Sequence, residues 1–162
     1  MRLSSRFVFI VLTIVPLGLV AAGFFLGKYP RLQPCYLCNF QRLLYLMLAA
    51  FALGGVFSPR IKKLWSFFFG LTALGGVLVA LQQSWMQYAP EQTTECGFSD
   101  PTLIERLVDW LGALWPSMFM VTGFCKDKEL VFFGLSLANL SGVCFLGLTL
   151  VASWQFFRRA PK

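Results

Sequence analysis

The sequence predicts an all-α membrane protein, a four-transmembrane-helix bundle with a short interfacial helix in its second outer loop. Of its 162 residues, 57% are hydrophobic and only 13% are charged, and a soluble domain of this length could not bury so much apolar surface. The apolar residues also gather in long uncharged runs, which are typical of membrane helices. We expect a single domain over residues 1–162, without repeats or linkers.

The four expected spans cover approximately residues 7–27, 38–57, 64–85 and 130–154. The first run is longer than the core of a signal peptide, so we interpret it as a retained helix. In the second run the wholly apolar part begins only at Leu43, which is too late for a helix rising ~1.5 Å per residue to cross ~30 Å of hydrocarbon. The second helix must therefore begin near Cys38, which places this cysteine at the membrane boundary.

Charge predicts the orientation of the spans. The N-terminus, the turn at 58–63 and the C-terminus carry only basic residues, whereas all seven acidic residues fall within the second outer loop, about 86–129. Basic segments stay in the cytoplasm, so we expect both termini there and both outer loops, about 28–37 and 86–129, in an oxidising compartment. The net charge of +7 lies in short clusters beside the spans and does not indicate nucleic-acid binding.

The second outer loop contains an amphipathic pattern from Leu103 to Trp115, with apolar residues recurring at spacings of three and four. Asp100 and Pro101 resemble an N-cap and a proline at the first helical position, and Pro116 is expected to end the helix. A short helix of this kind typically lies in the membrane interface. It either covers loop backbone or keeps the cysteine loop near the surface while letting it move.

Cys35 and Cys38 form a C-x-x-C pair, a spacing that allows cycling between dithiol and disulfide. Cys38 is expected in the first turn of the second helix, where the helix N-terminus favours a thiolate. Arg42 lies one turn deeper on the same face, with a thiolate, a quinone carbonyl or a lipid phosphate as its expected partner. The alternatives are a structural tie or half a zinc site for the cysteines, and an interfacial anchor for Arg42.

Cys96 and Cys125 lie in the second outer loop and form either a second redox pair or a permanent loop staple. Lysines at 126 and 128 would favour a thiolate at Cys125. A zinc site of all four cysteines is disfavoured, because only one pair is close in sequence and the chain has no histidine. Cys144 lies deep in the fourth run, where we interpret it as a packing residue.

These residues resemble the DsbB-type disulfide-bond oxidoreductases of Gram-negative inner membranes, over nearly the whole chain. The resemblance rests on four spans, on the Cys-Gly at 96–97 and on two further motifs. The first motif is C-x-L-C-x-x-Q-R, starting at Cys35 and including Gln41 and Arg42; the second is P-x-x-F-x-x-x-G-x-C, from Pro116 to Cys125. Where some relatives have a histidine before the third cysteine, this chain has Gln82 and Gln83.

The resemblance implies a thiol oxidase of the bacterial inner membrane with Cys35, Cys38, Cys96 and Cys125 as catalytic residues. It implies that a DsbA-type periplasmic thioredoxin-fold partner attacks a Cys96–Cys125 disulfide at Cys96, after which Cys125 attacks Cys35. It also implies that Cys38, Arg42 and Gln41 bind a membrane quinone, ubiquinone or menaquinone, which accepts the electrons.

Two other functions remain as alternatives at this point. One is a quinone reductase of the vitamin K epoxide reductase type, although in that family the loop cysteines precede the C-x-x-C. The other is a non-enzymatic membrane scaffold with two structural disulfides.

Overall fold

The computed structural model describes residues 5–26, 34–88, 102–123, 131–132 and 135–157. Its long helices are α1 (Ser5–Leu26), α2 (Tyr36–Phe57), α3 (Lys62–Tyr88) and α6 (Leu137–Phe157). All four are long and apolar enough to cross a membrane, and a helix pairs its backbone polar groups internally, as hydrocarbon requires. The predicted all-α bundle of four membrane helices is therefore confirmed.

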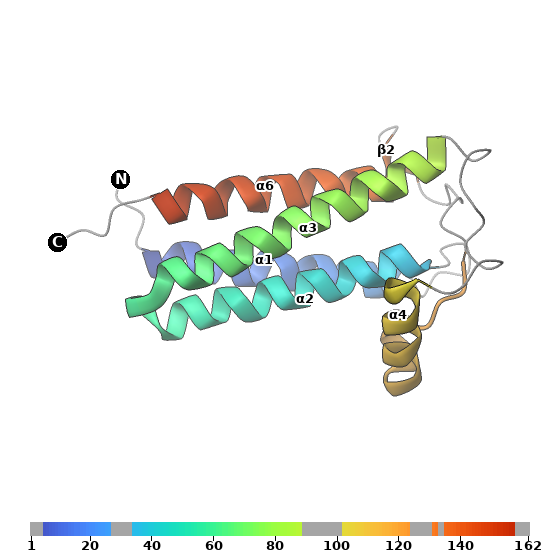
Figure 1. Cartoon of the computed structure of the whole chain (residues 1–162), viewed down its shortest axis with the longest axis horizontal. Helices are drawn as coiled ribbons and strands as arrows, with labels where there is room; N and C mark the ends of the chain where they lie inside the picture. Colours follow the sequence, from blue (N-terminus) through green and yellow to red (C-terminus); the bar gives the residue numbers. More distant parts are fainter. Residues whose placement is uncertain (1–4, 27–33, 89–101, 124–130, 133–134, 158–162) are drawn as a thin grey trace.

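The helices pack in an order that brings both chain ends to one side. α1 packs against α2, α2 against α3, and α3 against α6. The 3-10 turn η1 (Pro59–Ile61) joins α2 to α3. The start of α1, the η1 turn and the end of α6 lie at one end of the bundle, and helix α4 (Leu103–Leu114) lies at the other (Figure 1). A chain that crosses the membrane four times must begin and end on the same side.

Glycines opposite phenylalanine rings set how closely neighbouring helices approach. A Cβ atom at Gly55 of α2 would lie 2.5 Å from the ring of Phe9 on α1, and one at Gly76 of α3 would overlap the ring of Phe145 on α6. The Phe145 ring also stacks on Tyr45 of α2, with ring centroids 4.1 Å apart. Close packing of this kind holds helices together in lipid, where apolar surface gains nothing by leaving the solvent.

The fourth span begins later than predicted. α6 starts at Leu137 rather than at residue 130, and the residues before it include two short antiparallel strands, β1 (Val131–Phe132) and β2 (Leu135–Ser136). These residues are apolar, so hydropathy does not separate them from the helix that follows. Cys144 accordingly lies about 10 Å along α6 at ~1.5 Å per residue, nearer the start of its helix than predicted.

Helix α4 forms where the amphipathic pattern predicts it, with a different N-cap. Thr102 caps the helix, because its Oγ1 accepts a hydrogen bond from the Glu105 backbone N–H at 3.3 Å, while Glu105 Oε2 accepts one from the Thr102 N–H at 2.7 Å. This reciprocal capping box replaces the predicted cap at Asp100, which lies outside the described residues. The helix ends at Leu114, ahead of Pro116, as predicted.

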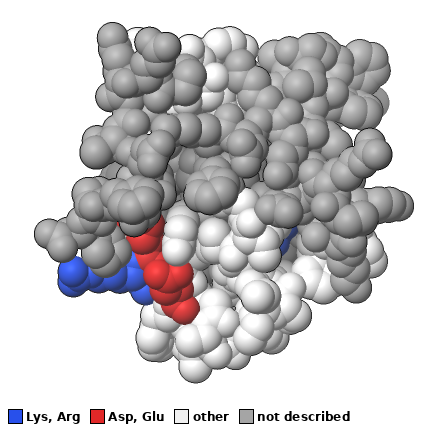
Figure 2. Space-filling view, turned by 90° about the vertical axis from the view of Figure 1, so that its right-hand side faces the viewer, with Lys and Arg blue, Asp and Glu red and all other residues white. Residues whose placement is uncertain are grey.

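One side of α4 carries an apolar stripe that stays exposed. Val108, on the opposite side, is wholly buried. Figure 2 shows this end of the molecule, where the acidic atoms and most of the visible basic atoms of the described residues gather at one side, next to a largely uncharged surface. The exposed apolar stripe suits a helix that lies in the membrane interface. Its residues are Leu103, Leu107, Trp110 and Leu114.

Candidate functional site

Cys35 and Cys38 lie together at the N-terminus of α2, at the end of the bundle away from η1. Cys35 is the N-cap, with extended backbone, and its Sγ accepts a hydrogen bond from the Cys38 backbone N–H at 3.4 Å. The two sulfurs are 3.0 Å apart, with the Cys35 thiol donating to Cys38. This separation exceeds the ~2.05 Å of a disulfide, so the pair is a dithiol whose sulfurs need to move little to bond.

Gln83 of α3 contacts both sulfurs, and the sequence prediction did not include it as a site residue. Its Nε2 donates to Cys38 Sγ at 3.1 Å and to Cys35 Sγ at 3.5 Å. Its Oε1 accepts a hydrogen bond from Gln41 Nε2 at 2.9 Å. A glutamine within an apolar span needs a polar partner, and this signal could have singled out Gln83. Gln41, which the resemblance implies as a quinone-binding residue, makes this contact with Gln83 in the structure.

Arg42 of α2 bonds to two backbone carbonyls and to one side-chain oxygen. Its Nη2 donates to Gly23 O of α1 at 2.8 Å, and its Nη1 donates to Met118 O at 3.0 Å and to Asn39 Oδ1 at 3.3 Å. Met118 belongs to α5 (Pro116–Phe119), the short helix after α4. The guanidinium therefore joins α1, α2 and α5 beside the dithiol.

Asn39, the residue after Cys38, is a second polar residue that the sequence prediction did not include. It has no exposed surface, and its Nδ2 donates to Phe119 O at 2.8 Å and to Met120 O at 3.2 Å. A buried amide must satisfy its donors, and here it does so on backbone about 80 positions away. Asn39 thus holds the end of α5 against the first turn of α2.

A third contact joins the segment after α5 to the chain before Cys35. The backbone N–H groups of Thr122 and Gly123 donate to Pro34 O at 3.1 and 3.4 Å. The described part of the second outer loop therefore ends beside the dithiol. Cys96 and Cys125, the other predicted catalytic cysteines, lie outside the described residues.

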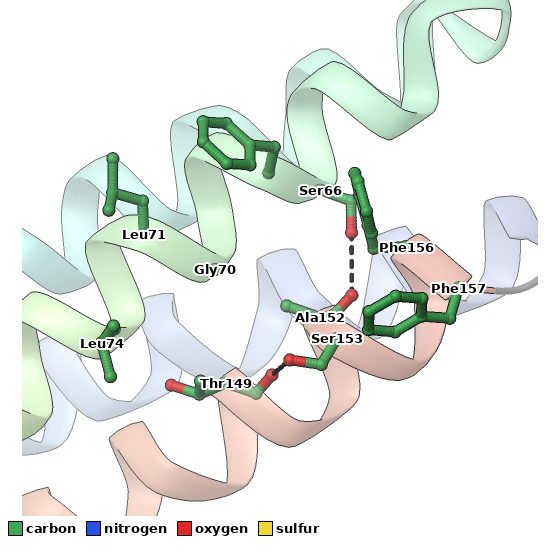
Figure 3. Close-up of a pocket in the computed structure, with 10 residues that line it drawn as sticks. Ser66, Gly70, Leu71, Leu74, Thr149, Ala152, Ser153, Phe156 and Phe157 are labelled. Atoms are coloured by element: carbon green, nitrogen blue, oxygen red, sulfur yellow. Dashed lines mark hydrogen bonds between the residues drawn. The ribbon is translucent and has the colours of Figure 1, made fainter.

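A groove of about 260 Å³ lies between α3 and α6 at the opposite end of the bundle (Figure 3). Hydroxyl groups on its walls bond to backbone: Ser66 Oγ donates to Ala152 O at 3.0 Å, and Ser153 Oγ donates to Thr149 O at 2.9 Å. Apolar side chains such as Leu74 complete the lining. The groove lies at the end of the bundle near the η1 turn, and none of its lining residues belongs to the dithiol site.

The fold and the site together define a multi-pass membrane protein with a redox-capable dithiol where one of its membrane helices begins. Comparison with known proteins narrows this class. Residues 5–155 match the sequence model of the family described as "Disulfide bond formation protein DsbB".

Relatives named "Disulfide bond formation protein B" match along most of their length. The relative from Dechloromonas aromatica is 48% identical over 143 residues, which are 88% of this chain and 87% of the relative. The relative from Aromatoleum aromaticum is 37% identical over 163 residues, 98% of this chain and 95% of the relative. The chain belongs to the DsbB family, and it is a membrane protein of disulfide-bond formation.

Proposed function

We propose that this protein is a protein-dithiol:quinone oxidoreductase of the bacterial inner membrane, with both termini in the cytoplasm. It reoxidises a DsbA-type thioredoxin-fold protein of the periplasm and passes the electrons to a membrane quinone, ubiquinone or menaquinone. The observation that carries the proposal is the Cys35–Cys38 dithiol in the first turn of a membrane helix. A thiol on the aqueous side and a lipid-soluble acceptor can both approach that position.

The proposed route is a series of thiol–disulfide exchanges that ends at this dithiol. The reduced partner attacks Cys96 of a Cys96–Cys125 disulfide and leaves with its own disulfide formed. The Cys125 thiolate attacks Cys35 of a Cys35–Cys38 disulfide, and Cys38 leaves as a thiolate. The Cys96 thiolate then attacks Cys125, which restores the Cys96–Cys125 disulfide and releases Cys35 as a thiolate. Oxidation of the Cys35–Cys38 dithiol re-forms its disulfide, and the two electrons and two protons pass to the acceptor.

The backbone contacts at Pro34 support the transfer from Cys125 to Cys35. The Gly123 N–H is bonded to the carbonyl of Pro34, the residue before Cys35. Cys125 follows Gly123 by two positions, so chain length alone keeps their Cα atoms within about 7 Å. The contact at Pro34 is therefore compatible with the proposed transfer from Cys125 to Cys35.

The residues around Cys38 fit a quinone as the acceptor. A bound quinone supplies a ring that accepts two electrons and two protons. Arg42 has five N–H donors and makes three hydrogen bonds to described residues, which leaves donors for a ring carbonyl. Beside its partner Gly23, Phe24 and Phe25 pack edge to face with centroids 5.9 Å apart, and Phe25 is 63% exposed, so an apolar ring has a surface to lie on.

The experiment is turnover of the purified protein in lipid with a short-chain ubiquinone and a reduced thioredoxin-fold dithiol protein. Quinone loss is followed by ultraviolet absorbance, and thiols are trapped by acid quenching and alkylation. We expect quinone and partner dithiol to disappear in equal amounts. Serine substitution of any one of four cysteines should stop turnover, while Cys144→Ala should retain it. The four are Cys35, Cys38, Cys96 and Cys125.

Three outcomes would contradict the proposal. If the partner dithiol is oxidised while quinone is unchanged, the acceptor is not a quinone. If both disulfides resist the partner and quinone is unchanged, the protein is a scaffold with structural disulfides. Equal turnover in the Cys38→Ser variant would place the electron exit elsewhere.

A further inference from the structure

Two buried glutamines form a chain of hydrogen bonds that ends on the dithiol. Gln41 of α2 is 6% exposed and Gln83 of α3 is 3% exposed. Gln41 Nε2 donates to Gln83 Oε1, and Gln83 Nε2 donates to the sulfurs, more closely to Cys38 than to Cys35. Both ends of the Gln83 amide are therefore hydrogen-bonded. Because Gln83 is buried, losing either bond would leave a polar group without a partner, which is costly.

The donors around Cys38 indicate which sulfur carries negative charge. Cys38 Sγ receives hydrogen bonds from the Cys35 thiol at 3.0 Å and from Gln83 at 3.1 Å. A neutral thiol sulfur is a weak acceptor, whereas a thiolate is a strong one, and bonds to an ionised acceptor are roughly twice as strong as neutral ones. The site is arranged around an anionic Cys38.

The hydrogen bond from Gln41 favours one orientation of the Gln83 amide. An amide has a donor end and an acceptor end of nearly equal shape, so its orientation depends on its partners. Because Gln41 presents an N–H to Gln83, the Gln83 oxygen turns toward α2 and its NH₂ group turns toward Cys38. The opposite orientation would place the Gln83 oxygen against the thiolate and repel it, and the bond to Gln41 disfavours that orientation.

We propose that Gln83 is a catalytic residue that stabilises the Cys38 thiolate, and that Gln41 is the positioning residue that orients it. The inference deepens the proposed function. Only the role of Gln83 in turnover rests on that function, whereas its stabilisation of the Cys38 thiolate does not. Gln83 donates a hydrogen bond and neither gains nor loses a proton. A neutral donor of this kind supports the thiolate in a chain without any histidine.

The test measures the Cys38 thiolate directly, in full-length protein reduced in lipid and free of quinone. Cys96, Cys125 and Cys144 are replaced, so that only the two dithiol cysteines remain. Thiolate is read by its ultraviolet absorbance at neutral pH, and the rate of iodoacetamide attack at Cys38 is read by mass spectrometry. The variants are Gln83→Met, Gln41→Met and the double variant, because methionine keeps the volume and removes the hydrogen bonds.

Gln83→Met should lower the thiolate absorbance of Cys38. Loss of a charge-assisted hydrogen bond changes the balance of thiolate and thiol about tenfold, and the more basic thiolate that remains reacts about threefold faster, so alkylation should slow by a net factor of about three. Gln41→Met should act in the same direction by a smaller factor. In the double variant, Gln41→Met should add nothing to the effect of Gln83→Met, because Gln41 acts through Gln83.

Gln82→Met is the matched control, since Gln82 precedes Gln83 on α3 and is exposed. It should change neither readout. The inference is overturned if Gln83→Met leaves the Cys38 thiolate unchanged while the protein keeps its melting temperature. The positioning role is overturned if Gln41→Met has its full effect in the Gln83→Met background. These results do not depend on quinone, so they separate failure of this inference from failure of the proposed oxidase activity.

Discussion

Replacing Asn39 with leucine should release α5 from the dithiol. Leucine has nearly the shape of asparagine, but it cannot donate to the carbonyls of Phe119 and Met120. Leaving a buried acceptor unsatisfied costs about 1–3 kcal/mol, and a partly exposed hydrogen bond contributes about 0.5–1.5 kcal/mol. The bond to Phe119 is buried and the bond to Met120 is partly buried, so we expect the docked state to lose about 2–3 kcal/mol.

Amide hydrogen exchange measures this loss where it occurs. At about 1.4 kcal/mol per tenfold, the open state of the segment should become roughly 30 to 150 times more populated. The amides of Thr122 and Gly123, which donate to Pro34 O, should exchange faster by the same factor in Asn39→Leu protein. Amides in the middle of α3 should exchange as before, because among the described residues Asn39 bonds to Arg42, Phe119 and Met120 and not to that helix.

Two results would refute this reasoning. Unchanged exchange at Thr122 and Gly123 would mean that Asn39 does not hold the segment. Equal acceleration in α3 would mean that the substitution destabilises the whole bundle rather than one contact. If the segment alone is released, the proposed transfer from Cys125 to Cys35 should also slow, because that route starts from the docked segment.

Further predictions concern packing, capping and the remaining cysteine. Gly76→Ala should destabilise the bundle by about 1–3 kcal/mol, because the added methyl meets the Phe145 ring; unfolding in detergent measures this, and a second substitution, Phe145→Leu, should recover part of the loss. Thr102→Ala should lower the stability of α4 by about 1 kcal/mol, because it removes the hydroxyl that caps the Glu105 N–H; faster amide exchange in the first turn would show it. Cys144→Ala should leave the acid-trapped pattern of disulfides unchanged, and a missing disulfide on non-reducing gels would contradict the packing role.

The fold could be predicted because membrane helices follow from local composition. Each span is a run of apolar residues long enough to cross the membrane. The apolar run that begins at Leu43 is too short to cross alone, so α2 was expected to begin earlier, near Cys38. The start of α6 could not be predicted in the same way. Residues 131–136 are as apolar as a helix, and the short strand pair within them depends on pairing rather than on hydropathy.

The site could be predicted only where its chemistry is local in sequence. Cys35 and Cys38 are three positions apart, so their meeting at a helix start follows from spacing. The bond between Gln41 and Gln83 joins residues 42 positions apart, and Asn39 meets Phe119 across 80 positions. Such pairs depend on how helices pack, which no local pattern specifies. The one signal that the sequence offered for Asn39, Gln41 and Gln83 was that they are polar residues within or beside apolar runs.

The most direct test of the account is the side of the membrane from which the dithiol is reached. In spheroplasts expressing protein that retains only Cys35 and Cys38, a membrane-impermeant maleimide is added outside after reduction. The account predicts labelling of the dithiol without permeabilising the cells, and protection when a lipid-soluble quinone is added first. Labelling that requires entry of the reagent into the cytoplasm would contradict it.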